Sequence, residues 1–257
     1  MSSNSTHRVW PQVPIRPEPA AGRIFSFIQH NRNRFDPGSG QIEGADMNSA
    51  QSSQLQIFKE QAEASAAQVF VVSDIEQALR RVVQSCAAKQ ACTPLAAGCG
   101  QDLSQAAADL CSLKDWSKIM AAPGLDSRDL EFLTSLCREE SIKLIQAGLR
   151  SHLGGIDVGL TWAESGIAET GTAVLNSSRE DIRLAGMISE IHAVLLPAAG
   201  IVPDTTALHQ KLAADFRNQP NYSAFITGPS RTADIERVLT LGVHGPLEVH
   251  IYVIGGI

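Results

Sequence analysis

Three glycine-rich polar segments hold the residue types best suited to chemistry. They span residues 161–172, 226–236 and 242–247, and each lies beside a run of apolar residues typical of a strand. In open α/β sheets, ligands bind beyond the carboxyl ends of strands, so functional side chains gather on the loops that leave strands. The three segments are therefore the first candidates for a functional site.

The first segment predicts carboxylate chemistry around Glu169. A Glu beside Gly-Thr could act as a nucleophile, as a general base or as an acceptor for a substrate hydroxyl group. Thr170, Gly171 and Thr172 are candidate binding residues, because nearby backbone N–H groups could stabilise an oxyanion. The alternative is structural: Gly166 and Gly171 make tight turns while the threonines satisfy backbone groups. The spacing alone does not decide between the two.

The second segment predicts an anion site. A strand would end before Gly228, and a helix would begin near Thr232, where free N–H groups and the positive end of the helix dipole attract a carboxylate or phosphate. Ser230 and Thr232 would add hydroxyl groups, and Arg231 a fork-shaped cation. The alternative is that Ser230 or Thr232 only caps the helix, Asp234 complements its dipole and Arg231 is solvated.

The third segment adds His244, which stands between Val243 and a Gly-Pro pair. If the last strand is parallel, the helix before it would carry His244 to the opposite end of the sheet from Arg231, which favours a structural role. A helix of about eight residues spans only roughly 12 Å, however, so the separation would be modest. His244 therefore stays a candidate binding residue.

Hydrophobic periodicity predicts that helices and strands alternate from residue 49 onward, with Asp74 as a helix N-cap. The expected helices span residues 49–66, 74–89, 103–110, 127–139, 179–187, 204–217 and 232–239. The expected strands span residues 68–72, 95–97, 118–121, 142–145, 158–161, 172–175, 191–196, 224–227 and 247–254. This alternation predicts an α/β fold with a mostly parallel sheet that is flanked by helices on both faces.

Residues 1–48 differ from the rest and predict a proline-rich N-terminal arm. The five prolines in this stretch remove backbone donors and prevent regular pairing. An apolar group around Phe25 and Phe27 fits a short helix that docks on the body or on a partner, with simple disorder as the alternative. Residues 49–257 would then form the α/β domain.

Charge and hydropathy exclude several classes of protein. The chain has 21 Lys and Arg against 27 Asp and Glu, a net charge of −6, so it lacks the basic surface of a nucleic-acid binder or a membrane-surface binder. No run of about 18 apolar residues and no signal-peptide pattern occurs, which predicts a soluble, cytoplasmic protein without a membrane span. Small molecules or proteins are the expected partners.

The cysteines predict neither a metal site nor an iron–sulfur cluster. The chain has five cysteines and no C-x-x-C pair. Iron–sulfur clusters and structural zinc need ligands that converge from closely spaced positions. We therefore expect reduced, mostly buried thiols and no cofactor bound by this chain.

Taken together, the three segments resemble the LUD (lactate utilization domain) family. The resemblance rests on I-A-E-T-G-T, then G-P-S-R-T-A-D-I-E, then G-V-H-G-P, in this order and at these intervals, and it is strong from Val158 to Ile254. Arg183, ahead of the strand that contains I-H-A-V-L, also resembles an Arg of the family. The chain departs from the family in the length of residues 1–48, onto which nothing is carried over, and in lacking a proline just before that strand.

This resemblance implies a fold similar to that of the CoA transferases and the ribose-phosphate isomerases. It also implies a role in oxidising L-lactate to pyruvate, in a three-component system whose other two members carry the iron–sulfur clusters. Iron–sulfur subunits are therefore the expected partners, and the redox centres are expected in those chains.

Our leading hypothesis is a non-iron–sulfur subunit of a lactate-oxidising dehydrogenase complex that binds a small carboxylate. Arg231 or Arg183 would pair with the carboxylate, and Glu169 would orient or deprotonate the region of the hydroxyl carbon. One rival is a free-standing CoA-transferase-like enzyme in which Glu169 forms an acyl intermediate. A third interpretation is a non-catalytic assembly subunit whose arm grips a partner. These alternatives leave open whether the chain is an enzyme and whether it forms a homo-oligomer.

Overall fold

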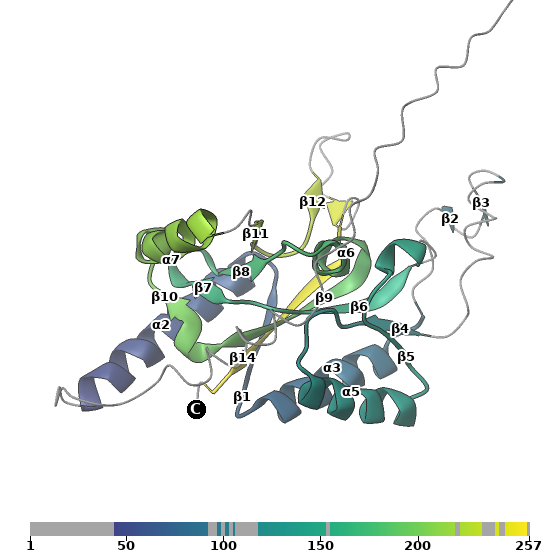
Figure 1. Ribbon diagram of the computed structural model, residues 1–257, viewed down its shortest axis with the longest axis horizontal. Helices are drawn as coiled ribbons and strands as arrows, with labels where there is room; N and C mark the ends of the chain where they lie inside the picture. The colour runs from purple at the N-terminus through teal and green to yellow at the C-terminus, as the bar shows by residue number, and fades with distance from the viewer. Residues whose placement is uncertain are drawn as a thin grey trace, which may run out of the picture. The chain divides into compact units, whose positions relative to one another are not determined.

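The apolar strands form one six-stranded parallel sheet in the computed structural model (Figure 1). The strand order is β1-β14-β9-β6-β4-β5, and every neighbouring pair runs parallel. The strands of this main sheet are β1 (Gln68–Val72), β4 (Ile119–Ala121), β5 (Lys143–Ile145), β6 (Ile156–Trp162), β9 (Ser189–Pro197) and β14 (Glu248–Ile254). The predicted α/β fold with a mostly parallel sheet is confirmed, and the last strand, β14, runs parallel to both of its neighbours.

The structure describes most of the chain after residue 43. The described residues are 44–91, 97–98, 101–102, 105, 118–152, 155–218, 222–232, 240–241 and 245–255. The predicted arm up to residue 43 lies outside them, as does all of the expected helix at 103–110 apart from residue 105. None of the described helices is long and apolar enough to cross a membrane.

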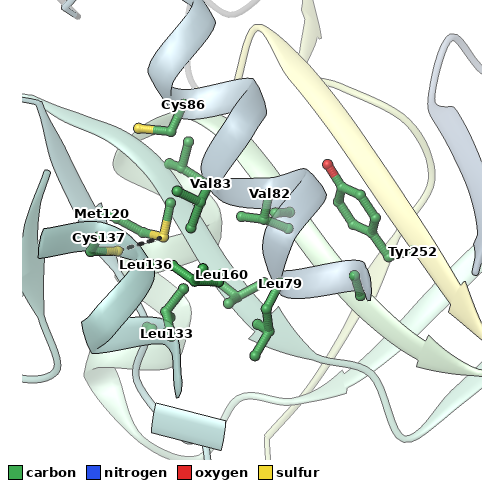
Figure 2. Packing of buried hydrophobic residues seen from close by; sticks show 14 of the residues in the cluster. Leu79, Val82, Val83, Cys86, Met120, Leu133, Leu136, Cys137, Leu160 and Tyr252 are labelled. Carbon is green, nitrogen blue, oxygen red and sulfur yellow. Dashed lines mark hydrogen bonds between the residues drawn. The ribbon is translucent and has the colours of Figure 1, made fainter. Parts of the chain in front are cut away.

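Two amphipathic helices, α3 (Ile75–Ala88) and α5 (Ser127–Glu139), cover one face of the main sheet. Their apolar side chains pack on Met120, Leu160 and Tyr252 of the strands, as Figure 2 shows. The N-caps are aspartates: Asp74 accepts a hydrogen bond from the N–H of Gln77 at 2.8 Å, which confirms the predicted cap. Local capping and burial of one face therefore both define where these helices lie.

The other face is covered by helices and by a second, smaller sheet. The helices of this layer are α2 (Gly44–Ala64), which begins at Gly44 instead of at Ser49, α6 (Glu180–Ile188) and α7 (Thr205–Asn218). The four strands of the small sheet run in the order β10 (Ile201–Val202), β7 (Ser165–Ile167), β8 (Thr172–Asn176) and β11 (Ser223–Ile226). The remaining short elements are β2 (Ala97–Gly98), β3 (Gln101–Asp102), η2 (Leu149–Ser151), η3 (Ala168–Thr170) and η4 (Ala198–Gly200).

The expected strands at 172–175 and 224–227 exist, but they belong to the small sheet, where β8 pairs antiparallel with both β7 and β11. The reason is the length of the connection. Only the short turn η3 and Gly171 join β7 to β8, whereas a parallel pair needs a crossover of about a dozen residues or more. The first polar segment is therefore not one loop, because it contains a strand and a helical turn.

The prediction that a helix begins near Thr232 is wrong. Arg231–Thr232 forms strand β12, which pairs antiparallel with β13 (Thr240–Leu241), and Thr232 stands opposite Thr240. A cross-strand pair of β-branched threonines favours extended backbone over helix. The predicted anion site at a helix N-terminus therefore has no helix at Ser230–Thr232.

Two glycines, Gly171 in the first polar segment and Gly228 in the second, allow direct contact between their backbone and the backbone at the end of α2. Both have left-handed backbone angles, with φ of +62° and +67°. A Cβ atom would lie 2.1 Å from the backbone N of Ala62 at Gly171, and 2.0 Å from the carbonyl oxygen of Ser65 at Gly228. Gly166, by contrast, lies inside β7 and makes no turn. Gly171 and Gly228 therefore join the small sheet and its following loop to α2.

We predict that Gly171→Ala lowers the free energy of unfolding by about 3 kcal/mol. The left-handed backbone accounts for about 1 kcal/mol of this loss, and the displacement of α2 for the rest. Gly148→Ala is the matched control, because Gly148 has a φ of +71° and nothing within 4 Å of its Cβ position. Urea unfolding of both variants measures the difference, and equal losses would contradict a role for the contact with Ala62.

Candidate functional site

A cavity of about 350 Å³ lies on the face of the main sheet that carries the small sheet. Its walls come from the end of α6 (Gly186 and Met187), from His192 on β9, from residues 225–230 and from the Gly245–Pro246 turn before β14. The second and third polar segments therefore meet at one place. The cavity lies over the amino-terminal parts of β9 and β14, not beyond the carboxyl ends of the parallel strands as expected, because β11 folds back over the sheet.

Backbone hydrogen bonds hold the two loop walls together. The N–H of Ser230 donates to the carbonyl oxygen of Pro246 at 3.3 Å, and the N–H of Leu247 donates to that of Glu190 at 2.9 Å. Glu190 also pairs with Lys89 at 3.1 Å, and Lys89 pairs with the fully buried Asp157 at 2.8 Å. Burial of the Lys89 ammonium opposes its charge, but hydrogen bonds to both carboxylates outweigh this and raise its pKa. The turn before β14 is therefore hydrogen-bonded to Glu190, whose side chain is paired with Lys89.

His192 forms the floor of the cavity and is fully buried. Its Nε2 lies 2.8 Å from the hydroxyl oxygen of Thr161, which is also buried. The Nδ1 atom has no hydrogen-bond partner among the described residues. Burial lowers the pKa of His192 to about 4, because water cannot solvate the imidazolium. The imidazole is therefore neutral at physiological pH.

Two glycines let α6 lie close enough to bring its end over His192. A Cβ atom at Gly159 of β6 would lie 2.0 Å from the carbonyl oxygen of Ala185 in α6. A Cβ atom at Gly186 would lie 3.0 Å from Cε1 of the His192 ring. The absence of both side chains leaves room for the helix on the sheet and for the imidazole beside the helix.

A chain of threonine hydroxyl groups connects the first polar segment to the cavity. Thr170 and Thr172 lie 2.7 Å apart at their hydroxyl oxygens, and Thr172 lies at the same distance from Thr227 in the cavity wall. Glu169 is exposed on η3, and its N–H donates to the carbonyl oxygen of Pro203. Glu169 does not line the cavity. Its neighbour Thr170 is linked through Thr172 to Thr227, which does.

Arg183 binds backbone instead of lining the cavity. Its guanidinium donates to the carbonyl oxygens of Ser177 and Ser178 and lies 5.7 Å from the ring of Tyr222. The Arg183 side chain thereby fastens the turn between β8 and α6. A ligand would have to compete with these contacts in order to use its charge.

The cavity brings together only some of the residues predicted from sequence. Gly228 and Ser230 line it, and Arg231 follows Ser230 directly at the start of β12. Asp234 and His244 lie outside the described residues. Sequence reasoning missed His192, although a signal was present: it is the one ionisable residue in the apolar run at 191–196.

We predict that acid destabilises the protein through His192. The pKa of the folded state is about 4 and that of a free histidine is about 6.5, so the unfolded chain binds more protons between these values. The stabilising contribution of His192 to the free energy of unfolding is fully present above pH 6.5. It falls as the pH decreases towards 4, by about 3 kcal/mol in all. Urea unfolding between pH 7 and pH 4 measures this loss.

In that experiment, His192→Gln should flatten the dependence of unfolding free energy on pH by about the same 3 kcal/mol. His209→Gln is the control, because His209 is exposed on α7 and its replacement should leave the wild-type curve unchanged. A wild-type slope retained in His192→Gln would show that the acid sensitivity arises from other groups.

Comparison with known proteins identifies the family. The lactate utilization protein C of Anoxybacillus flavithermus is 37% identical over 98 residues, which is 38% of this chain and 44% of that protein. The protein of the same name from Bacillus subtilis is 37% identical over 95 residues, or 36% and 40% of the two chains. The chain thus matches less than half the length of these relatives. A DUF162 family structure from Deinococcus radiodurans covers 80% of this chain and 98% of its own, with 15% identity and a TM-score of 0.48. Because the model of the LUD domain matches residues 55–254, the chain belongs to the LUD domain family.

Proposed function

We propose that this chain takes part in lactate utilization and binds a small carboxylate, lactate or pyruvate, in the cavity above His192. The observation that carries the proposal is that residues 226–230 and 245–246, from two polar segments, meet around one cavity with a buried histidine at its floor. The relatives named lactate utilization protein C support the choice of ligand class. The role of this chain would be to bind and orient the organic acid.

The size and lining of the cavity suit such a ligand. A volume of about 350 Å³ lies at the small end of the range for ligand pockets, which favours a molecule of few atoms. The hydroxyl groups of Thr227 and Ser230 offer hydrogen bonds, while Met187 and Phe225 offer apolar contact at the rim. Because Arg183 already binds carbonyl groups, Arg231 is the cation we propose for the ligand carboxylate.

Oxidation of lactate also requires an electron acceptor. We propose that they leave through iron–sulfur partner subunits, as the resemblance to the LUD family implies. The two cysteines described by the structure, Cys86 and Cys137, are buried in the core, and burial raises their pKa values to about 12 and 11. These thiols pack between α3, α5 and the sheet (Figure 2), and neither is among the residues that line the cavity.

We predict that calorimetry detects binding of pyruvate or lactate to the wild-type protein, and that Ser230→Leu weakens it at least tenfold. The larger side chain would occupy part of the cavity, and tenfold corresponds to about 1.4 kcal/mol. Ser135→Leu is the matched control, since Ser135 is exposed on α5 at the opposite face of the sheet. Absence of heat with both acids on the wild type would overturn the proposed ligand class.

The exposure of Glu169 favours a second candidate function, that of a CoA-transferase-like enzyme. An exposed carboxylate on a short helical turn is accessible to a large thioester and could form an acyl intermediate with loss of the CoA thiolate. We predict that mass spectrometry after incubation with acetyl-CoA then finds an acyl or CoA adduct on the wild type and none on Glu169→Gln. An unmodified wild-type protein would eliminate this candidate and leave the cavity proposal unaffected.

A further inference from the structure

We propose that His192 recognises the ligand of the cavity by donating its Nδ1–H to an acceptor oxygen of a small carbonyl or carboxylate compound, with Thr161 holding the ring in the required tautomer. The ligand class rests on the proposed function, whereas the tautomer and the direction of the hydrogen bond rest on the geometry around the ring. His192 is thus a binding residue that selects for an oxygen acceptor.

The first step is the state of the ring. A neutral imidazole carries one N–H, so one ring nitrogen donates and the other accepts. Burial keeps the ring neutral by lowering its pKa to about 4. Which nitrogen carries the proton therefore depends on the partner of the other nitrogen.

The second step is the hydroxyl group of Thr161. It is 1% exposed, and among the described residues its oxygen has one hydrogen-bond partner, Nε2 of His192 at 2.8 Å. Without a ligand, each tautomer leaves one buried donor without an acceptor among the described residues: the Thr161 hydroxyl if Nε2 carries the proton, or the Nδ1–H if Nδ1 carries it. With a ligand oxygen at Nδ1, both donors are satisfied only when the Thr161 hydroxyl donates to Nε2 and the ring proton is on Nδ1.

The third step is the Nδ1–H group itself. It is buried and has no hydrogen-bond partner among the described residues, while the ring forms the floor of the cavity. A buried donor of this kind gains a full hydrogen bond when an acceptor reaches it. The end of α6 lies beside this atom: a Cβ atom at Gly186 would lie 3.4 Å from Nδ1, so the missing side chain leaves space next to the donor. An oxygen of a keto, hydroxyl or carboxylate group fits this donor, and a ligand without an acceptor does not.

His250 is a matched control within the same chain. It is also buried, its Nε2 also has a partner, Glu248 at 2.7 Å, and its Nδ1 is also unpartnered among the described side chains. His250, however, packs against Phe70 beside Tyr252, on the α3 side of the sheet, and does not line the cavity. Because the partner of Nε2 in His250 is a carboxylate, which can only accept, its Nε2–H donates; His250 is therefore a control, outside the cavity, for a buried histidine with one ring nitrogen that has no partner in the described part of the chain.

The experiment combines nitrogen NMR with calorimetry on the full chain. In ¹⁵N-histidine-labelled protein, the signals of His192 are those lost in His192→Gln. We expect Nδ1 to be protonated when pyruvate is bound and its signal to shift on addition of pyruvate. In calorimetry, His192→Gln, whose amide replaces Nε2, should weaken pyruvate about tenfold, whereas His192→Asn, whose amide replaces Nδ1, should retain most of the affinity. Gly186→Ala should weaken binding, and His250→Gln should not.

Acetone, a neutral probe with only an acceptor oxygen, separates this inference from the proposed function. If pyruvate and lactate do not bind but acetone shifts Nδ1 of His192, the ligand class is wrong and the donor role stands. If pyruvate binds while Nδ1 is unshifted and His192→Gln keeps wild-type affinity, the cavity proposal stands and the role of His192 is overturned. A proton found on Nε2 in the presence of bound pyruvate, or no shift with any of the three compounds, also overturns it.

Discussion

Close contact between backbones, which only glycine permits, joins the small sheet to α2 and α6 to the main sheet. Gly171 and Gly228 lie against the last turn of α2, and Gly159 lies against the carbonyl oxygen of Ala185 in α6. A Cβ atom at any of these positions would lie 2.0–2.1 Å from the opposing backbone. Side chains can adjust to a tight contact, but backbone atoms inside helices cannot do so without loss of hydrogen bonds, so these glycines determine how near the layers lie.

The cavity is a consequence of that spacing. With α6 pressed on β6 and the small sheet joined to α2, the loop after β11 and the turn before β14 face each other across the amino-terminal part of β9. The residue of β9 below them is a histidine within an apolar strand, held by Thr161 and covered by the end of α6. A polar group is costly in such a place unless it is satisfied, and a ligand oxygen would satisfy it.

In each of the first two polar segments, some residues make packing contacts and others are exposed or line the cavity. In I-A-E-T-G-T, the glycine packs on α2 and the threonines form the hydroxyl chain, which leaves Glu169 as its exposed acidic group. In G-P-S-R-T, the glycine again packs on α2 while Ser230 reaches the cavity wall. The structural interpretation therefore applies to Gly171, Gly228 and the threonines, while a chemical role for Glu169 or Ser230 stays a prediction.

Local pattern alone determined the α/β class, most helices and strands, and the cap at Asp74, because periodicity and capping depend on neighbours within a few residues. The sequence also pointed to Gly228 and Ser230. Only the tertiary structure decided that residues 172–175 and 224–227 form a separate antiparallel sheet, that Arg231–Thr232 is extended, and that Arg183 binds backbone. The surroundings of His192 belong there too, since Thr161 and Gly186 lie against it from other parts of the chain, and no local sequence pattern predicts such contacts.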